Sequence, residues 1–412
     1  MKNLSLKKSN SKSGMHPLIT GTIILTVTGL ITRTIGFFYR IYLSRLFGEE
    51  GMGIYQLVNP VLSLSFALTA AGFQTAISKL VAESLASMKH PSVKPMIAGF
   101  TITIPLSVLC TFFIYSFADF LGNTAFGDPR TIPMIKILAL SIPFAAIHAC
   151  INGYFYGRKK AGVPAGTQLI EQLARVACVF LITQKSISKG QTPDITVATW
   201  GLTIAEFISM AAAIAAMYIY YSKELALIKN KGLQAAAYIR NHGQNRKIRF
   251  NYMNIYGGLL AMAVPLSANR IILNILASIE SVSIPSALRS YGYDNSTALS
   301  VYGVLTGMAM PFIFFPNAIT GSISVLLLPM ISEKNAYGDT DAIKRASFKT
   351  IKYCFILGFI FLSIFVVFGD LAGRLVFDSS LAGYFIKTLG FLCPFLYLDS
   401  TLSIILQGLG MA

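Results

Sequence analysis

The most informative shortage in this sequence is of charge. Only 12% of its 412 residues are Asp, Glu, Lys or Arg, whereas 54% are hydrophobic. Soluble globular proteins carry about 25% charged residues, so this composition excludes an ordinary soluble domain. It indicates instead a chain that crosses a membrane several times.

Residues and motifs that mark enzymes are also sparse. The five cysteines all fall inside apolar runs without metal-ligand spacing, so we expect neither a disulfide framework nor a metal cluster. Of four histidines, only His148 lies in an apolar run, where we expect it to be a packed helix residue. No Gly-rich phosphate loop is present, which argues against ATP as the direct energy source. A membrane-embedded transferase is therefore a weak alternative.

Ten apolar stretches can each span a bilayer, which takes roughly 20 helical residues. They cover residues 18–38, 54–81, 96–117, 132–156, 165–183, 195–221, 253–277, 297–330, 351–368 and 384–406. The polar N-terminal segment resembles the start of a signal peptide, but the run that follows lacks a cleavage site and contains Arg33. We therefore expect an all-α, polytopic membrane protein whose first helix is retained.

The basic residues of the loops are unevenly distributed between the two sides of the membrane. If the ten stretches alternate in direction, 21 Lys and Arg lie on the side of the N-terminus and eight on the other. Short cytoplasmic loops carry the excess of basic residues in membrane proteins. The N-terminus is therefore expected to be cytoplasmic, and the net charge of +17 does not indicate a nucleic-acid partner.

The first apolar run carries a stripe of small and cationic residues. Residues seven apart lie almost on one line of a helix, so Gly29, Gly36 and Arg40 share a face with Arg33. An arginine at the centre of a spanning helix costs about 2.5 to 3.5 kcal/mol and almost always faces a bundle interior or a water-filled cavity. We predict that this helix forms a cavity wall.

Four further cations lie inside apolar runs. Lys79 and Lys136 are near the ends of theirs, where a lysine can extend to the interface. Arg270 lies deeper, as does Arg175, which follows Glu171 by four residues in the favourable order for an intrahelical ion pair. This pair belongs either to a binding site or to the contacts that hold neighbouring helices together.

Positions about 250 residues apart resemble each other. The matches are Pro143-Phe144 with Pro394-Phe395, Gly157 with Gly408, and Glu83 with Glu333. This period contains six helices, so the two copies have the same orientation and form a parallel repeat. We predict an N-terminal lobe over residues 1–221, a basic cytoplasmic linker over 222–251, and a C-terminal lobe over 252–412. The second copy holds four helices, which suggests a shortened chain or a longer family.

Six segments carry a family resemblance. They are GTIIL at 21–25, RTIGFFYR at 33–40, GIYQ at 53–56, QTAISK at 74–79, EQLAR at 171–175 and YGVLTGM at 302–308. With them the chain resembles the stage V sporulation protein B group of polysaccharide exporters. It also resembles, more distantly, the lipid II flippases of the same superfamily of multidrug, oligosaccharidyl-lipid and polysaccharide exporters.

This resemblance implies two pseudo-symmetric lobes around a central cavity, alternating access, and cavity arginines that bind a lipid diphosphate. Arg33 matches the first arginine of the first-helix motif, whereas Arg40 lies one residue beyond the second. The second and eighth spans have no matching arginine. The implied substrate is therefore an anionic polyprenyl-linked saccharide rather than lipid II specifically.

The chemistry of such a substrate agrees with the cationic residues, because a guanidinium donates two parallel hydrogen bonds to a phosphate and keeps its charge. We expect Arg33 and Arg270 to be equivalent first-helix cations of the two lobes. The candidate substrate-binding residues are Arg33, Arg40, Lys136, Glu171, Arg175 and Arg270. We expect a flippase in the bacterial cytoplasmic membrane, without a cofactor other than a coupling ion of unknown kind, and with cell-wall synthesis proteins as further partners.

A multidrug or cation antiporter of the same superfamily is the main alternative. Such a transporter needs a buried carboxylate for its cation or proton. The acids inside apolar runs are Glu171, Glu206 and Asp399, and the first run has none.

The charge distribution predicts which loops are accessible from outside the cell. Single cysteines are to be introduced at Ser188 and at Gln234 and labelled in intact cells with a membrane-impermeant maleimide, with the parent chain as control. We expect labelling at Ser188 only. Labelling at Gln234 without labelling at Ser188 would reverse the orientation.

Overall fold

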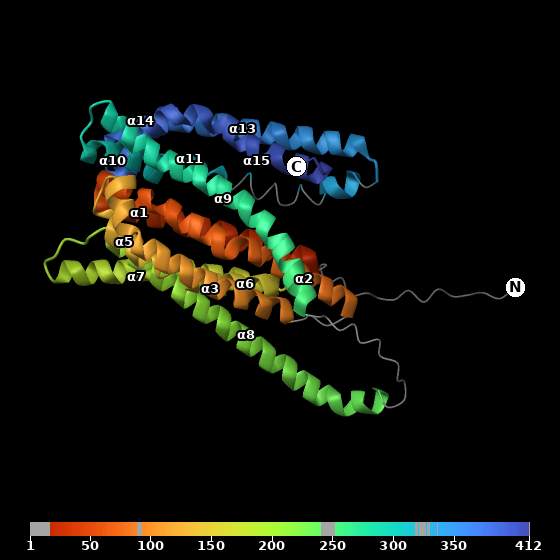
Figure 1. Cartoon of the computed structure of the whole chain (residues 1–412). Coiled ribbons are helices and arrows are strands. Elements are labelled where there is room, and N and C mark those ends of the chain that lie inside the picture. Colours follow the sequence, from red (N-terminus) through yellow and green to blue (C-terminus); the bar gives the residue numbers. More distant parts are fainter. Residues whose placement is uncertain are drawn as a thin grey trace.

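The computed structural model describes residues 17–88, 93–239, 252–317, 320, 327, 330–335 and 337–411. These residues form helices joined by turns and short loops, without a strand in the described ranges. Figure 1 shows most of the helices running roughly along one common direction. The all-α fold expected from composition is confirmed.

The first half of the chain begins with a long helix that bends. α1 (Pro17–Phe66) is interrupted at Gly48, whose φ of 69° lies in the left-handed region that glycine tolerates best. The chain continues through η1 (Ala67–Ala71), α2 (Gly72–Met88), α3 (Lys94–Ser116), α4 (Ala118–Phe120), η2 (Leu121–Ala125), α5 (Thr131–Ala139), α6 (Ile142–Gly157), α7 (Gly162–Ser188) and α8 (Thr196–Ile239). The predicted linker thus begins inside α8, and residues 240–251 lie outside the described part of the chain.

The second half repeats this pattern of long helices and short breaks. It comprises α9 (Tyr252–Ser290), α10 (Asn295–Gly303), η3 (Val304–Ala309), α11 (Met310–Phe314), α13 (Thr340–Phe377), α14 (Ser380–Leu389), η4 (Gly390–Leu392) and α15 (Cys393–Leu409). Residues 318–319, 321–326 and 328–329 of the predicted eighth span lie outside the described residues.

The number of membrane spans follows from helix length. Eight helices in the described ranges are long and apolar enough to cross a membrane, or nine when the bent pair α5 and α6 counts as one span. The first of the eight, Ile23–Leu85, has 63 residues, and the Gly48 kink divides it into two segments of spanning length. With this division the described helices overlap all ten predicted spans.

The two repeats meet where α1 crosses α10. A Cβ atom on Gly53 would lie 2.0 Å from the carbonyl oxygen of Leu299, and one on Gly303 would lie 2.3 Å from that of Glu49. In both pairs of equivalent residues the offset is 250, so one contact is the copy of the other. Such a self-complementary contact is expected at a two-fold axis. The parallel repeat is confirmed, and glycine is required at both positions because any side chain would clash.

A contact within each lobe shows the same symmetry with exchanged residue types. In the first lobe Thr103 Oγ1 lies 3.3 Å from Cys150 Sγ, joining α3 to α6. In the second lobe Cys354 Sγ lies 3.0 Å from Thr401 Oγ1, joining α13 to α15. Both cysteines are buried and free, so they act as packing residues and not as disulfide partners.

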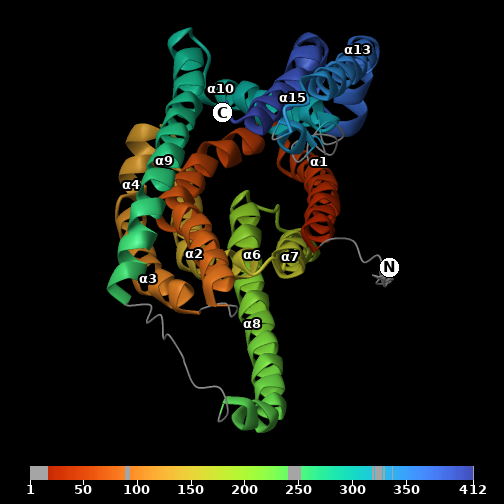
Figure 2. The ribbon, with the colours of Figure 1, turned by 90° about the vertical axis from the view of Figure 1, so that its right-hand side faces the viewer.

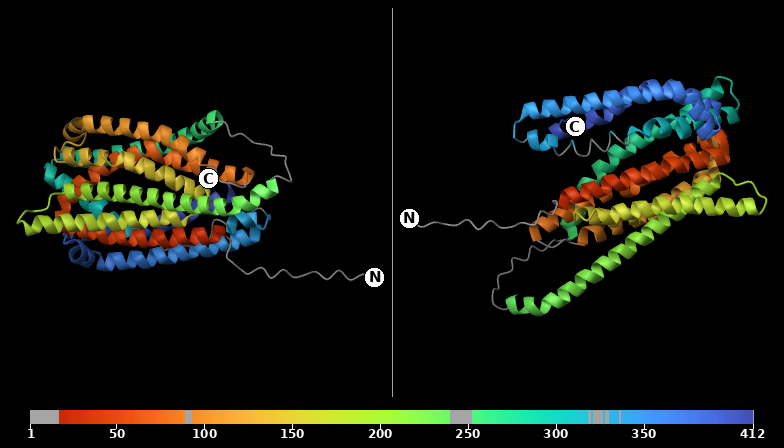
Figure 3. Two further views of the ribbon diagram at one scale, coloured as in Figure 1. Left: turned by 90° about the horizontal axis from the view of Figure 1, so that it is seen from below. Right: turned by 180° about the vertical axis from the view of Figure 1, so that it is seen from behind.

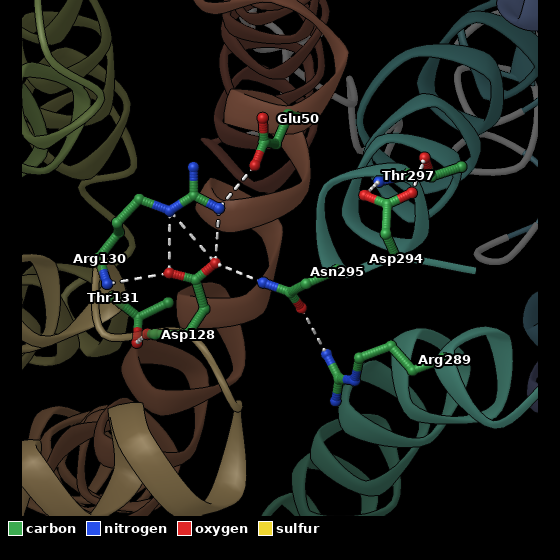
Figure 4. A network of polar contacts seen from close by, with 8 residues as sticks. All are labelled: Glu50, Asp128, Arg130, Thr131, Arg289, Asp294, Asn295 and Thr297. Carbon is green, nitrogen blue, oxygen red and sulfur yellow. Dashed lines mark hydrogen bonds and ion pairs between the residues drawn. The ribbon is translucent and has the colours of Figure 1, made fainter. Parts of the chain in front are cut away.

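A polar network joins the lobes at one end of the molecule (Figure 4). Arg130 Nη2 lies 2.6 Å from Glu50 Oε1 and 2.6 Å from Asp128 Oδ2. Asn295 Nδ2 donates to Asp128 Oδ2 at 3.1 Å, and Arg289 Nη1 donates to Asn295 Oδ1 at 3.0 Å. Because Asn295 and Arg289 belong to the second repeat, Asp128 links the two lobes directly.

From the end that carries this network the two groups of helices diverge. Figure 1 and the right-hand view of Figure 3 show α13 and α15 separating progressively from α2, α3 and α8 toward the end where the chain begins. Figure 2 shows α13 and α15 on one side of the molecule and α6, α7 and α8 on the other. The network therefore lies at the end where α13 and α15 are nearest to these helices of the first lobe, whereas α9 also packs on α2 and α3.

The ionisation of Asp128 makes the polar network between the lobes sensitive to acid. The residue is 1% exposed, and this burial by itself would raise the pKa of its carboxyl group. Hydrogen bonds from the Arg130 side chain and backbone, with a further one from Asn295, outweigh it and lower the pKa below its usual value. The network is therefore held by an ionised Asp128.

We expect Asp128→Asn to lower the stability of the purified protein at neutral pH by about 1 to 3 kcal/mol, because a buried charged acceptor is lost. With a lowered folded-state pKa, the contribution of Asp128 is present above its unfolded value, about 3.9, and is lost as pH falls through the folded value. Thermal melts between about pH 3 and pH 7 test this, and the variant should lack the acid-induced step. Asp119→Asn, which alters an exposed ion pair, is the control. Indistinguishable melts of Asp128→Asn and the parent would contradict the assignment.

Candidate functional site

A cavity of about 610 Å³ lies between the first helix of one lobe and the α10–α11 region of the other. We call it the basic cavity. Its lining residues are Arg33, Gly36, Phe37, Arg40, Gln56, Thr306, Met310, Pro311, Phe314, Phe315 and Asn317. The prediction that the Arg33 helix forms a cavity wall is confirmed, because Arg33, Gly36 and Arg40 lie on the cavity face of α1.

The basic cavity has an unbalanced positive charge. Arg33 and Arg40 are its two ionised lining residues, and its described lining contains no carboxylate. Within the described part of the chain, neither arginine has a hydrogen-bond or ion-pair partner. Arg33 is exposed and Arg40 is half-buried. Two guanidinium groups are therefore available to an anionic ligand in a space between the lobes.

The walls of the basic cavity are held by contacts between the two repeats. The Phe37 ring of α1 stacks on Phe315 with 4.4 Å between ring centroids. Gln56 Nε2 donates to the Thr306 carbonyl oxygen at 2.8 Å, and these residues are 250 positions apart, so the bond lies close to the pseudo-two-fold axis. A ligand in this cavity would touch both lobes.

A second cavity, of about 410 Å³, lies inside the N-terminal lobe among α1, α2, α6, α7 and α8. We call it the N-lobe cavity. Its polar lining residues are Ser63, Gln74, Ser141, His148, Asn152, Tyr156, Gln168, Glu171, Arg175 and Glu206. The charged residues that sequence reasoning grouped together are thus divided between two cavities.

The predicted pair of Glu171 and Arg175 is present. Arg175 Nη2 donates to Glu171 Oε1, one turn earlier on α7, and about one fifth of each side chain is exposed. Arg175 is also close enough to Arg40 for the two charges to act on each other. Gly36 helps to bring α1 and α7 together, since a Cβ atom there would lie 3.3 Å from Gln172 Nε2. Arg175 therefore lies between the N-lobe cavity and the basic cavity.

His148 and Glu206 complete the N-lobe cavity in a way that sequence reasoning missed. His148 is buried, as expected for a packed residue, but its Nδ1 lies 3.2 Å from Glu206 Oε1. The ligand atoms of His148, Glu171 and Glu206 all lie within 4.8 Å of one another. The three residues come from different helices, α6, α7 and α8, so no spacing in the sequence could reveal their meeting.

Lys136 lies away from both polar cavities. Its Nζ is 3.1 Å from Asp119 Oδ1, and in the second repeat Lys387 Nζ is 3.3 Å from Asp370 Oδ2, with 17 residues between the partners in both lobes. The recurrence at an offset of 251 supports a structural role for this ion pair. A contact between Lys136 and substrate stays a prediction.

Arg270 is exposed on α9 and is absent from the described lining of the basic cavity. It lies 20 residues before the end of α9 at Ser290, whereas Arg33 lies 15 residues before the kink at Gly48. Measured from these ends, the two depths differ by about 7.5 Å at 1.5 Å per residue. The equivalence of Arg33 and Arg270 stays a prediction.

An apolar cavity of about 820 Å³ lies between the two lobes near the end that carries the polar network. Its walls come from α1, α3, η2 and α9, and include Leu64, Phe113, Phe117, Ile275 and Ile279. Phe113, Phe117, Ile275 and Ile279 are all exposed, so this cavity is accessible from the apolar surface that faces the membrane.

Residues 18–335 match the family described as polysaccharide biosynthesis protein. Stage V sporulation protein B of Bacillus subtilis (strain 168) is 30% identical over 396 residues, which cover 96% of this chain and 73% of that protein. Lipid II flippase MurJ of the same organism is 21% identical over 336 residues, covering 78% of this chain and 59% of that protein.

Two solved structures are similar in fold. An inward-facing multidrug resistance MATE family transporter of the MOP superfamily matches with a TM-score of 0.59 and 15% identity, over 95% of this chain and 85% of that one. An outward-facing structure of the same kind matches with a TM-score of 0.59 and 12% identity, over 97% and 83%. At these identities the similarity concerns the fold alone.

The ion pair on α7 predicts non-additive effects of substitution. Glu171→Gln and Arg175→Met should each leave a charge without its partner, and each should destabilise the protein more than the double variant does. We expect a coupling energy of about 0.5 to 3 kcal/mol in thermal melts of the purified protein. The same cycle at the exposed pair Asp119 and Lys136 is the control and should give weaker coupling. Strictly additive losses at Glu171 and Arg175 would rule out the coupling.

Proposed function

Because the chain belongs to the polysaccharide biosynthesis protein family, we propose that it is a membrane transporter that flips a lipid-linked saccharide. The substrate is an oligosaccharide or peptidoglycan precursor carried on a polyprenyl diphosphate. Flipping proceeds from the cytoplasmic to the outer face of a bacterial membrane by alternating access of the two lobes. The relative named as a lipid II flippase supports this class of substrate.

One observation carries the proposal, namely that the basic cavity holds two guanidinium groups without a described counter-ion. A diphosphate offers several acceptor oxygens and enough negative charge to engage both Arg33 and Arg40. Charged residues inside a membrane are energetically costly, and those that occur usually line a substrate or ion pathway or a binding site. The family relationship and the cavity charge therefore point to the same ligand chemistry.

The other parts of such a substrate also have a place in the molecule. Amide groups of Gln56 and Asn317 and the Thr306 hydroxyl line the basic cavity and suit sugar hydroxyls. The apolar cavity between α1, α3, η2 and α9 is open to the lipid and suits an isoprenoid chain. A substrate bound across α1 and α11 would couple its binding to the relative position of the lobes.

The topology required is the one predicted from the loops, with a cytoplasmic N-terminus. In this arrangement the polar network at Asp128 lies on the outer side, and α13 and α15 diverge from α2, α3 and α8 toward the cytoplasm. The structure would then correspond to a state closed to the outside. Residues 1–221 and 252–412 act as the two moving lobes, joined by the segment 222–251.

The alternative of a multidrug or cation antiporter has less support. Its fold is available, as the MATE structures illustrate. However, Arg33 and Arg40 would repel a cationic drug from the basic cavity between the lobes.

We expect Arg33→Ala and Arg40→Ala each to slow flipping of a fluorescent polyprenyl-diphosphate sugar in proteoliposomes. Losing charged hydrogen bonds worth about 1.5 to 3 kcal/mol corresponds to roughly a 10- to 150-fold loss. Arg33→Lys should be intermediate, because lysine keeps the charge but loses the bidentate geometry. Arg270→Ala is included because the same defect is predicted for it.

Lys387→Ala is the matched control, since it removes a cation from an exposed pair outside the basic cavity. Melting temperatures of all variants distinguish a transport defect from misfolding. Normal flipping by Arg33→Ala or Arg40→Ala, with intact protein, would remove that residue from the proposed site. Normal flipping by Arg270→Ala alone would restrict the site to the cavity described above.

A further inference from the structure

We propose that His148, Glu206, Glu171 and Arg175 form a proton-binding site in the N-lobe cavity, separate from the basic cavity. The ionisable atoms of the first three lie within 4.8 Å of one another, and Arg175 holds Glu171. The inference rests on the proposed function only for the purpose that the proton would serve, which is to drive transport.

The charges of this cluster do not balance without one more positive charge. With both carboxylates ionised and His148 neutral, Glu171, Glu206 and Arg175 carry a net charge of −1. His148 is 7% exposed, and the Glu206 side chain is 13% exposed, so water screens this charge poorly. One proton taken from water and shared between Glu206 and His148 brings the cluster to zero. A divalent metal ion would instead leave an excess positive charge beside Arg175.

The surroundings of His148 suit both of its protonation states. Asn152 Nδ2 lies 2.8 Å from His148 Nε2 and can donate to it when the ring is neutral. Ser209 Oγ donates to the Thr167 carbonyl oxygen at 3.1 Å, so its lone pair, 3.2 Å from the same Nε2, can accept a hydrogen bond from the imidazolium N–H. Histidine changes charge between about pH 5 and pH 8, which makes it suited to such a switch.

Arg175 connects this site with the basic cavity. Its guanidinium pairs with Glu171 on one side and acts on Arg40 on the other, and its buried Nε has no hydrogen-bond partner in the described residues. When one proton is bound by Glu206 and His148, the negative charge that offsets Arg175 falls by one unit, and the positive potential at Arg40 rises. Proton binding and anion binding are then mutually favourable, and linkage makes this coupling reciprocal.

The titratable and charged groups that face the cluster come from four helices. They are Tyr39, Arg40 and Tyr55 on α1, His148 and Tyr156 on α6, Glu171 and Arg175 on α7, and Glu206 on α8. Tyrosine loses its proton only near pH 10 in ordinary surroundings, so the proposed proton is assigned to the imidazole and carboxylates of the cluster and not to the tyrosines.

Infrared difference spectroscopy of the purified full chain in lipid tests the site without any substrate. Spectra are taken between about pH 8 and pH 5 in a sodium-free buffer. We expect a carboxylic-acid or imidazolium band to appear on acidification, and we expect both His148→Gln and Glu206→Gln to abolish it. Asp399→Asn, which alters another acid inside a membrane helix, is the matched control and should keep the band.

Arg33→Ala separates this proposal from the proposed function, because it weakens substrate binding but should leave the band unchanged. Thermal melts check that each variant folds. If Glu206→Gln does not fold, Glu206→Asp replaces it, and we then expect the band to shift in position. If His148→Gln and Glu206→Gln each removed a different band, the two residues would titrate independently, and the proposal of a shared site would be overturned. Displacement of the band by sodium chloride would identify a sodium site instead and would also overturn the proposal.

Discussion

The constraint on which this structure depends is the cost of placing guanidinium groups inside a membrane. Arg175 meets that cost through its ion pair with Glu171 on the same helix. Arg33 and Arg40 meet it differently, by facing a cavity between the lobes where solvent or an anion can reach them. Arg175 is therefore neutralised within the protein, whereas Arg33 and Arg40 can bind an anionic ligand.

The repeat determines where those free charges lie. The crossing of α1 and α10 brings Gly53 and Gly303 so close that the two backbones touch near the pseudo-two-fold axis. The basic cavity opens beside this crossing, so its walls come from both lobes. Close to this crossing, the buried Asp128 joins the lobes through Asn295, and Arg130 links Asp128 to Glu50 on α1. Toward the other end α13 and α15 diverge from the helices of the first lobe, while α9 stays packed on α2 and α3.

Much of this architecture was predictable from the sequence, because the length of the apolar runs and the repeat near 250 residues can be read directly from the order of residues. The Glu171–Arg175 pair was equally accessible, since both residues lie on one helix four positions apart. The meeting of His148 with Glu206 was not, because it depends on how three helices pack. The pairing of Lys136 with Asp119 was not predictable either, because the two residues lie 17 positions apart and meet only through packing. The depth of Arg270 relative to Arg33 depends on where α9 ends, which hydropathy does not resolve.

The central claim is that Arg33 and Arg40 bind the diphosphate of a lipid-linked saccharide. Native mass spectrometry of the purified protein with undecaprenyl diphosphate tests it most directly, because it measures binding without any transport step. The account predicts that the parent protein and Lys387→Ala retain the lipid equally and that the folded double variant Arg33→Ala/Arg40→Ala loses it. Equal retention by the double variant would contradict the assignment of the basic cavity.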